Sequence, residues 1–589
     1  MQIPLAKKVC FCFLATVVLI FPAYGRATDA TATFNVRNYG ATGYKSDNAQ
    51  SAIQSAIDAC AKAGGGRVYL PPGEYTSGTL HLRSHVRFYI EAGATLYASL
   101  QTGAFSKPPN TSALLYGEDL EDISIAGRGT IEGQAEYKWL PVQPEELKSE
   151  YGFLPASKMF NVVQEIERRA LPPGVTIDWS RVPYFGHITY NYAVAGAVAK
   201  AKGEPLMRSY PQGWPTDQDN PHMIQLIRCK DVRITGLSIL HSRSWTIRPV
   251  NCERVVIDGV YISTSLKYGV WADGIDPDGC KDVRISNCTI ATGDDSIVFY
   301  SMNWYGPARP CENITVTNCR LSSASAAIKF CDGNMNSVRN VTIDNCVITD
   351  SNRGIAFMVS DGGYVDNVVL SNLVINTHKF DWFWWGDGDP IHFMIERRSE
   401  MMGIPDKPGE PPAGSIRNVI IRNVIAHGQG SCLITGYPTS WLDNVSLENI
   451  RLFISTDPAM PYDKSVNALQ FRYARNLKVK DVQVNWEKPA WVNWRSALYF
   501  EDVDGLELSG FSGESARPQT EIPAVVLDKV TEAVVRDARP RPGTSLFLQV
   551  KGAKSGRIYL FGNELHAVST PYQLATGVKP TAVKASNNF

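Results

Sequence analysis

The sequence has no excess of either charge. Its 589 residues include 58 lysines and arginines and 58 aspartates and glutamates, so the formal net charge is zero. A neutral chain has no whole-molecule attraction for nucleic acid or anionic lipid, and we expect neither as a partner. Hydrophobic residues make up 44% of the chain and charged residues 20%, which is typical of soluble globular proteins.

Long apolar runs are missing after the N-terminus. Lys7 and Lys8 form a short basic region, an apolar run follows over residues 9–23, and the small residues Ala23 and Gly25 form a cleavage pattern. The run is too short for a comfortable membrane span, and no later stretch reaches about 18 apolar residues. We therefore expect residues 1–25 to be a signal peptide. The mature protein would then be exported to the periplasm or the extracellular space, with no membrane anchor.

Paired cysteine motifs are also missing. The chain has no C-x-x-C pair, so a zinc site is not expected, and we predict neither a metal nor a cofactor. Ten of the 12 cysteines follow the predicted signal peptide. Their spacing is repetitive, and Cys288, Cys319 and Cys346 each follow an asparagine. We interpret them as small apolar residues in repeated core positions.

A loose repeat runs through the chain from residue 227 onward. Its units include CKDVRISNCTI, ENITVTNCRL, RNVTIDNCVI and DNVVLSNLVI, and their equivalent positions Asp282, Asn313, Asn340 and Asn367 are 31, 27 and 27 residues apart. Such a period indicates a solenoid, and short runs of β-branched residues indicate strands. The blades of a propeller are longer than this period. We therefore predict an all-β fold, a right-handed parallel β-helix.

Asparagines recur at one predicted turn between two strands of the repeat, at Asn287, Asn318, Asn345 and Asn372. We expect these side chains to be buried. Their amides can both donate and accept, so they would bond to the backbone of the coils above and below and form a ladder.

The ends and the interruptions of the repeat define the predicted domain layout. Ile53, Ala56, Ile57 and Cys60 have helical spacing and predict a short helix that caps the open end of the solenoid. We place the β-helix at residues 30–545, with loop insertions at 135–215 and 376–413, and a C-terminal capping segment at 546–589. Insertions in solenoids are often on the binding face.

Three aspartates are the strongest candidates for chemistry. Asp273 precedes Asp294 and Asp295 by 21 and 22 residues, about one coil. Neighbouring coils lie roughly 4.8 Å apart, so the three carboxylates could share one surface patch. Crowded carboxylates separate one another's pKa values, and glycoside hydrolysis uses such an acid and base. A solvated turn and a calcium site remain alternatives, and adjacent residues can line one cleft only at a bend or bulge.

The chain resembles glycoside hydrolase family 28, the polygalacturonase and rhamnogalacturonan hydrolase family, from about Phe34 to about Leu452. FNVRNYGATG resembles the family's entry region, ADGIDPDG matches its N-T-D-G-x-D motif from the Asp onward, and GDDS matches its D-D motif. The resemblance implies that Asp294 is the general acid. It also implies that Asp273 and Asp295 activate water on the opposite face, which gives inversion.

The departures from the family concern its cationic motifs. Its Asn-Thr pair is Trp271-Ala272 here, its G-H-G motif should fall near residues 324–326 without a His, and its R-I-K motif should fall at 356–358 without either cation. In the family those cations hold the substrate carboxylate beyond the scissile bond. Since an Arg–carboxylate contact is strong and specific, we expect a neutral sugar such as rhamnose on that side.

Five further residues are candidate substrate contacts. Lys329 has the strand parity of the missing His and could reach the same cleft. Arg397 could bind an acidic sugar or form a surface salt bridge. Trp271 and Asp276 belong to the aspartate motif, and Trp384 lies in a tryptophan cluster that could stack on sugar rings or pack on the β-helix.

These features together predict an inverting glycoside hydrolase. Its expected substrate is an acidic pectic polysaccharide or oligosaccharide, polygalacturonate or rhamnogalacturonan-like, and we expect a monomer. Two alternatives remain. A catalytically inactive carbohydrate-binding β-helix would explain the lost cations, and a calcium-dependent polysaccharide lyase would share the fold.

Overall fold

A computed structural model describes most of the chain: residues 32–101, 103–105, 112–135, 220–266, 269, 271–330, 333–380, 386, 388–397, 409–455, 466–487 and 493–589. The predicted signal peptide and all but the first residue of the predicted insertion 135–215 lie outside these ranges. No helix among the described residues is long and apolar enough to cross a membrane.

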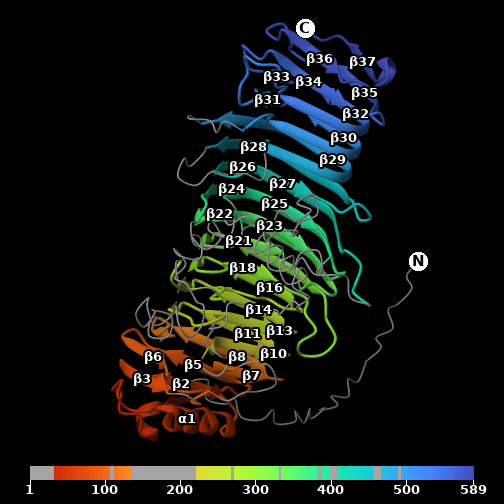
Figure 1. Cartoon of the computed structure of the whole chain (residues 1–589). Coiled ribbons are helices and arrows are strands. Elements are labelled where there is room, and N and C mark those ends of the chain that lie inside the picture. The colour runs from red at the N-terminus through yellow and green to blue at the C-terminus, as the bar shows by residue number, and fades with distance from the viewer. Residues whose placement is uncertain are drawn as a thin grey trace, which may run out of the picture.

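The described residues wind into a right-handed parallel β-helix, which confirms the predicted fold class. Figure 1 shows the coils stacked from α1 at one end to the C-terminus at the other. Each coil contributes strands to three parallel ladders, and the long strands from β22 onward pass from one ladder to the next.

The first ladder consists of β1 (Thr33–Asn35), β2 (Gly66–Leu70), β5 (Val86–Ile90), β8 (Glu121–Gly127), β11 (Lys230–Thr235), β14 (Glu253–Asp258), β16 (Lys281–Ser286), β19 (Cys311–Thr317), β22 (Ser337–Ser351), β24 (Tyr364–Thr377), β26 (Ser415–Gly428), β28 (Leu442–Ile454), β29 (Leu469–Trp486), β30 (Leu498–Ser509), β32 (Val525–Arg536), β35 (Gly556–Phe561) and β37 (Val583–Ser586). The second ladder adds to the long strands β3 (Gly73–Ser77), β6 (Ala94–Ala98), β9 (Thr130–Glu132), β12 (Ser238–Leu240), β15 (Tyr261–Ser263), β17 (Thr289–Thr292), β20 (Arg320–Ser323), β31 (Ser512–Gly513) and β33 (Arg539–Pro540).

The third ladder, which we call the cleft ladder, consists of β4 (Leu80–His81), β7 (Ala113–Glu118), β10 (His222–Ile227), β13 (Ile247–Val250), β18 (Ile297–Phe299), β21 (Ala326–Phe330), β23 (Arg353–Val359), β25 (Asp389–Ile395), β27 (Cys432–Thr435), the first residues of β29, β30 and β32, β34 (Leu546–Lys551) and β36 (Thr570–Leu574). Parallel pairing thus continues past residue 545, where we predicted the β-helix to end, as far as β37.

The N-terminal end of the solenoid is covered by α1 (Gln50–Lys62), after the short 3-10 helix η1 (Val36–Tyr39). The predicted apolar stripe of α1, Ile53, Ala56, Ile57 and Cys60, is buried. The helix therefore packs its apolar face on the first coils, which confirms the predicted capping helix. A second 3-10 helix, η3 (Pro580–Ala582), precedes the last strand.

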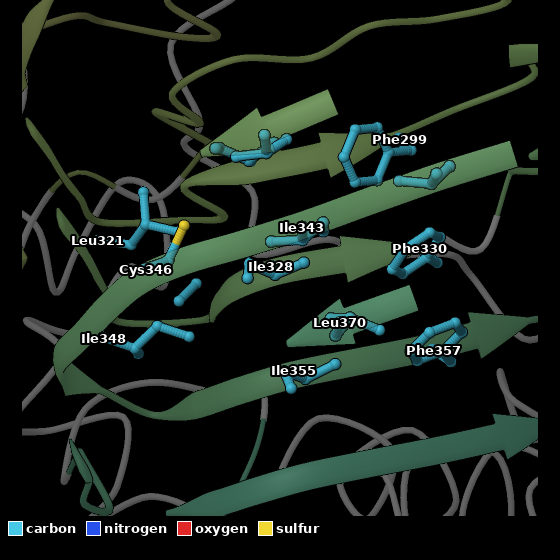
Figure 2. Close-up of a cluster of buried hydrophobic side chains, with 14 of the residues drawn as sticks. Phe299, Leu321, Ile328, Phe330, Ile343, Cys346, Ile348, Ile355, Phe357 and Leu370 are labelled. Atoms are coloured by element: carbon cyan, nitrogen blue, oxygen red, sulfur yellow. The ribbon is translucent and has the colours of Figure 1, made fainter. Parts of the chain in front are cut away.

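The core consists of side chains stacked in register from coil to coil. Figure 2 shows Phe299, Phe330 and Phe357 in one such row, with Ile328 and Ile355 in another. The ring centroids are 5.1 Å apart from Phe299 to Phe330 and 4.2 Å apart from Phe330 to Phe357. The nine cysteines among the described residues are buried and free, which confirms their predicted core positions.

The prediction of buried asparagine ladders was wrong in two respects, the burial of the side chains and their hydrogen-bond partners. Asn287 and Asn318 stand at turns with left-handed backbone, φ 58° and 54°, but their side chains are exposed. The amide of Asn318 donates to the side-chain oxygen of Asn287 at 3.4 Å, not to the backbone of the next coil. Asparagine suits these turns because it tolerates positive φ. These asparagines therefore recur because the backbone of each surface turn needs a positive φ.

Candidate active site

The three predicted aspartates converge on one side of the β-helix. One carboxylate oxygen from each of Asp273, Asp294 and Asp295 lies within 4.8 Å of the other two. Asp273 lies between β15 and β16, in a segment that replaces a regular cleft-ladder strand. Asp294 and Asp295 lie in the bend between β17 and β18. Adjacent residues of a regular strand point to opposite faces, whereas at a bend both can face the same side. The bend therefore allows Asp294 and Asp295 to face one cleft together.

Backbone pairing holds the two acidic segments in register. The amide of Gly274 donates to the carbonyl oxygen of Asp295 at 2.9 Å, and Ile275 bridges to Ile297. Gly293 permits a close approach at the bend, since a Cβ atom there would lie 2.4 Å from the carbonyl group of Gly269. The glycines before and after the aspartates therefore allow two coils to touch.

Asp294 has the environment of an acid. Its carboxyl accepts the backbone N–H of Trp271 at 3.1 Å and that of Asp295 at 3.0 Å. Burial, together with the neighbouring Asp295 carboxylate, raises the pKa of Asp294 to about 7, although Lys329 and the two backbone donors oppose part of this rise. At neutral pH this carboxyl is therefore protonated in a large fraction of molecules.

The surroundings of Asp273 and Asp276 also disfavour an ionised carboxylate. Burial raises the pKa of Asp273 well above its usual range, and the negative charges of Asp294 and Asp276 raise it further. Burial likewise raises the pKa of Asp276, with Arg248 opposing it. Neither carboxylate oxygen of Asp276 has a hydrogen-bond partner among the described residues. Asp276 is thus a buried carboxyl next to the trio, and its contact with the substrate stays a prediction.

Asp295 differs from the other two because donors surround it. Its Oδ1 accepts from the Ser325 hydroxyl at 2.7 Å and from the Ala326 amide at 3.1 Å. Its Oδ2 lies 2.8 Å from Nζ of Lys329, and both side chains are almost fully buried. An ionised carboxylate accepts three such bonds, and the ammonium balances its charge. Lys329 therefore lies in the site, as predicted, but it contacts Asp295.

The other predicted contacts have different outcomes. Trp271, at φ 68°, contributes its backbone N–H to Asp294. Arg397 forms an ion pair with Glu410 at 3.2 Å, the salt-bridge alternative among our expectations. Trp384 lies outside the described residues.

A cation and two aromatic rings were missed in the sequence. The Arg248 guanidinium lies 3.9 Å from the ring centre of Trp245 and 4.7 Å from that of Trp304, and its Nη2 is 3.2 Å from Asp278 Oδ2. The register of the cleft ladder places Arg248 one coil before Asp276. Aligning WTIRPV with GIDPDG as successive coils would have revealed this neighbour.

Beyond Lys329, the cleft ladder combines an apolar cluster with a buried arginine, Arg353, whose Nη1 lies 3.3 Å from the sulfur of Met358. Ala326, Ala356, Met358 and Met394 form a buried cluster on its outward side, whereas Phe357 points into the core. Ala356 and Met358 are the positions where the family's two cations should fall. The structure therefore puts apolar side chains on this side of the trio.

Comparisons with known proteins find a family model that covers the segment with the three aspartates. The family model described as glycosyl hydrolases family 28 matches residues 184–380, which include all three aspartates. The match covers less than half of the chain, and it supports the resemblance to glycoside hydrolase family 28. A second model, described as rhamnogalacturonase A/epimerase, pectate lyase-like, matches residues 33–104.

The chain is similar to two curated relatives over part of its length. It is 23% identical over 268 residues to a probable polygalacturonase of Vitis vinifera, covering 42% of this chain and 40% of the relative. It is 26% identical over 282 residues to an exo-poly-alpha-D-galacturonosidase of Dickeya chrysanthemi, covering 45% and 41%. The chain thus spans about two fifths of the length of these relatives.

A solved structure shares the fold of this chain. The exopolygalacturonase of Thermotoga maritima is 21% identical, with a TM-score of 0.54, and the match covers 77% of this chain and 92% of that one. At this identity the likeness concerns the fold alone.

Proposed function

We propose that this protein hydrolyses glycosidic bonds in an acidic pectic polysaccharide. The observation that carries the proposal is the convergence of three buried carboxyl groups in two electrostatic states, with Asp294 at a pKa of about 7 and Asp295 bound to a lysine ammonium. Glycoside hydrolysis needs a protonated carboxyl and an ionised one on opposite sides of the bond. The relatives named for polygalacturonase and galacturonosidase activity support a pectic substrate.

Each carboxyl has a proposed role. Asp294 donates its proton to the leaving oxygen. Asp295 accepts a proton from the attacking water, and the Lys329 ammonium lies 2.8 Å from its Oδ2. Asp273, which holds a proton more readily, orients that water with a hydrogen bond. Because each proton transfer occurs at a fixed group, each contributes roughly 10²–10⁴-fold to the rate.

We propose an inverting outcome, although the carboxylates are close together. Oxygens within 4.8 Å of one another are closer than the roughly 6.5–9.5 Å typical of inverting pairs. Our reason is the match of both acidic segments to the family 28 model, because the resemblance to this family implies inversion. The anomeric configuration of the first product, followed by NMR, tests this point. Retention would contradict inversion and leave hydrolysis intact.

We propose a neutral sugar, such as rhamnose, on the leaving-group side. The cluster of Ala326, Ala356, Met358 and Met394 suits a methyl group, and the buried cation beside it, Arg353, is already paired with Asp389 at 3.2 Å. Incubation with a panel of pectic polymers, followed by product identification, tests both substrate and activity. Turnover of homopolygalacturonate equal to that of rhamnogalacturonan would contradict the neutral subsite. No cleavage of any polymer would contradict the hydrolase proposal.

The calcium-dependent lyase is the alternative that the trio itself raises, because three carboxylates can bind a divalent cation. We favour hydrolysis because the Lys329 ammonium already lies on Asp295. A chelator should leave the rate unchanged, and the products should not absorb in the ultraviolet through a new double bond. Loss of activity on chelation together with such absorption would favour the lyase. We also propose that the protein acts as a monomer after export.

A further inference from the structure

A cavity lies on the cleft ladder, several coils beyond the aspartates. Its volume is about 470 Å³, within the range of sites that bind small ligands. Gln470 of β29, Tyr499 of β30 and Gln549 of β34 line it. None of these residues belongs to the segment that the family 28 model matches.

The cavity and the aspartates share one face of the β-helix. Pairing on the cleft ladder runs in one column from Lys329 through Ala356, His392, Leu433 and Gln470 to Tyr499. Figure 1 shows the strands of this column, β21, β23, β25, β27, β29 and β30, one above another. Five steps of roughly 4.8 Å put Tyr499 about 24 Å from Lys329 along the axis. A polysaccharide extended along the axis from the aspartates would reach the cavity.

The lining has the polar and aromatic groups that bind sugars. The hydroxyl of Tyr499 donates to Asp528 at 3.0 Å, which holds the ring in place. The side chains of Gln470 and Gln549 carry both donors and acceptors for sugar hydroxyls. An aromatic ring together with several amides is typical of a site that binds an amphipathic ligand.

The charges of the lining favour an acidic ligand. Arg495 and Lys551 line the cavity, and neither forms an ion pair with a described residue. The carboxylate of Glu501 is balanced by Arg472 and Lys529, each at 3.3 Å. Glu521, which is exposed, is the remaining acidic group among the lining residues. Two unpaired cations therefore face one unpaired carboxylate.

We propose that this cavity is a second carbohydrate site, which binds an acidic segment of the same polysaccharide about 24 Å from the bond that is cut. The inference rests on the proposed function. The ring of Tyr499 stacks on a sugar, the glutamines bind hydroxyls, and Arg495 and Lys551 bind a uronate carboxylate. Binding at two points on one chain raises the affinity for long polymers and leaves that for short oligomers unchanged.

Two variants of the full-length protein test the site. Tyr499→Ala removes the ring, and Arg495→Gln removes an exposed cation without disturbing the packing. Each should raise KM for a long pectic polymer roughly three- to tenfold, and neither should change kcat/KM for a short oligomer that reaches only the aspartates. Tyr559→Ala is the matched control, because Tyr559 is exposed on the first ladder, away from the cavity.

Equilibrium binding separates failure of this inference from failure of the proposed function. In an Asp294→Asn background, calorimetry with polygalacturonate should show weaker binding after either substitution. Hydrolysis that proceeds with polymer KM and polymer binding unchanged in both variants would overturn the second site. A protein that cuts no polymer, yet binds polygalacturonate through Tyr499 and Arg495, would contradict the hydrolase and support the cavity.

Discussion

Asp294 and Asp295 are neighbours in the chain but have different partners. Asp294 meets two backbone amides and a crowd of carboxyl groups, whereas Asp295 meets a hydroxyl, an amide and a lysine. Their order along the chain does not distinguish the two side chains. The next coil distinguishes them, because its Ser325 and Lys329 contact the carboxylate of Asp295 and not that of Asp294.

The pH dependence of the rate should reflect Asp294. The pKa of Asp294 is raised to about 7, and a general acid must be protonated, so kcat/KM should fall as the pH rises through about 7. The stability of the folded state should change with pH in the same direction. The folded state binds this proton more tightly than the unfolded state, so the contribution of Asp294 to stability is lost as the pH rises from about 4 to 7. Rate profiles and urea unfolding between pH 4 and 9 would check both. A rate that keeps rising above pH 7 would contradict the acid role.

Removal of the lysine should cost stability as well as activity. Lys329→Met leaves Asp295 buried without its counter-charge, and breaking such a pair costs about 3 kcal/mol in the free energy of unfolding. Adding Asp295→Asn to this variant should restore much of that stability but no activity. Denaturant unfolding of the two variants is the measurement. Equal stability of Lys329→Met and the wild type would show that the ion pair does not contribute to the free energy of unfolding.

At the scale of strands and coils, the sequence predicted what depends on its period. Spacings of 27 and 31 residues indicated one coil per repeat, and the coils indeed pair in parallel in that register. The exposure of Asn287 and its relatives could not be predicted in this way. A residue needed for positive φ repeats as regularly as a core residue does.

The stacked phenylalanines should carry much of the stability of the central coils. Phe330→Ala opens a cavity between Phe299 and Phe357, which are packed on either side, and should cost about 3–5 kcal/mol. Val347→Ala, on an exposed position of the next coil, should change stability by less than about 0.5 kcal/mol. Thermal and denaturant unfolding would compare them. Similar losses for the two variants would contradict the stacked core.

The candidate site was predictable in part for the same reason. Asp273 and the pair Asp294-Asp295 lie one coil apart in the sequence, so their meeting follows from the period. Arg248 also lies one coil from Asp276, but its coil lacks an acidic motif to draw attention to it. The cavity at Tyr499 depends on loops of irregular length, which no repeat predicts.

At the scale of the whole molecule, a solenoid exposes unpaired strand edges at its ends. The chain covers its N-terminal end with α1, whose buried stripe includes Ile57. Exposed edges promote association, so this cover is what we expect to keep the protein monomeric.

A charge buried beneath α1 should weaken the packing of this helix on the N-terminal end of the β-helix. Ile57→Asp puts an unpaired carboxylate under α1, and the variant should unfold more easily and form aggregates that light scattering detects. Ser55→Asp adds the same charge on the exposed side of α1 and should remain a monomer. A monomeric and stable Ile57→Asp protein would show that the helix does not protect the end of the β-helix.

The most direct test of the proposed function is the release of reducing ends from a pectic polymer by Asp294→Asn. The account predicts a correctly folded protein whose turnover is lower by at least about a hundredfold, because the amide cannot donate a proton to the leaving oxygen. Asp282→Asn, at an exposed position of β16 with left-handed backbone where asparagine fits, should retain full activity. Undiminished turnover of Asp294→Asn would contradict the role of the three carboxyl groups.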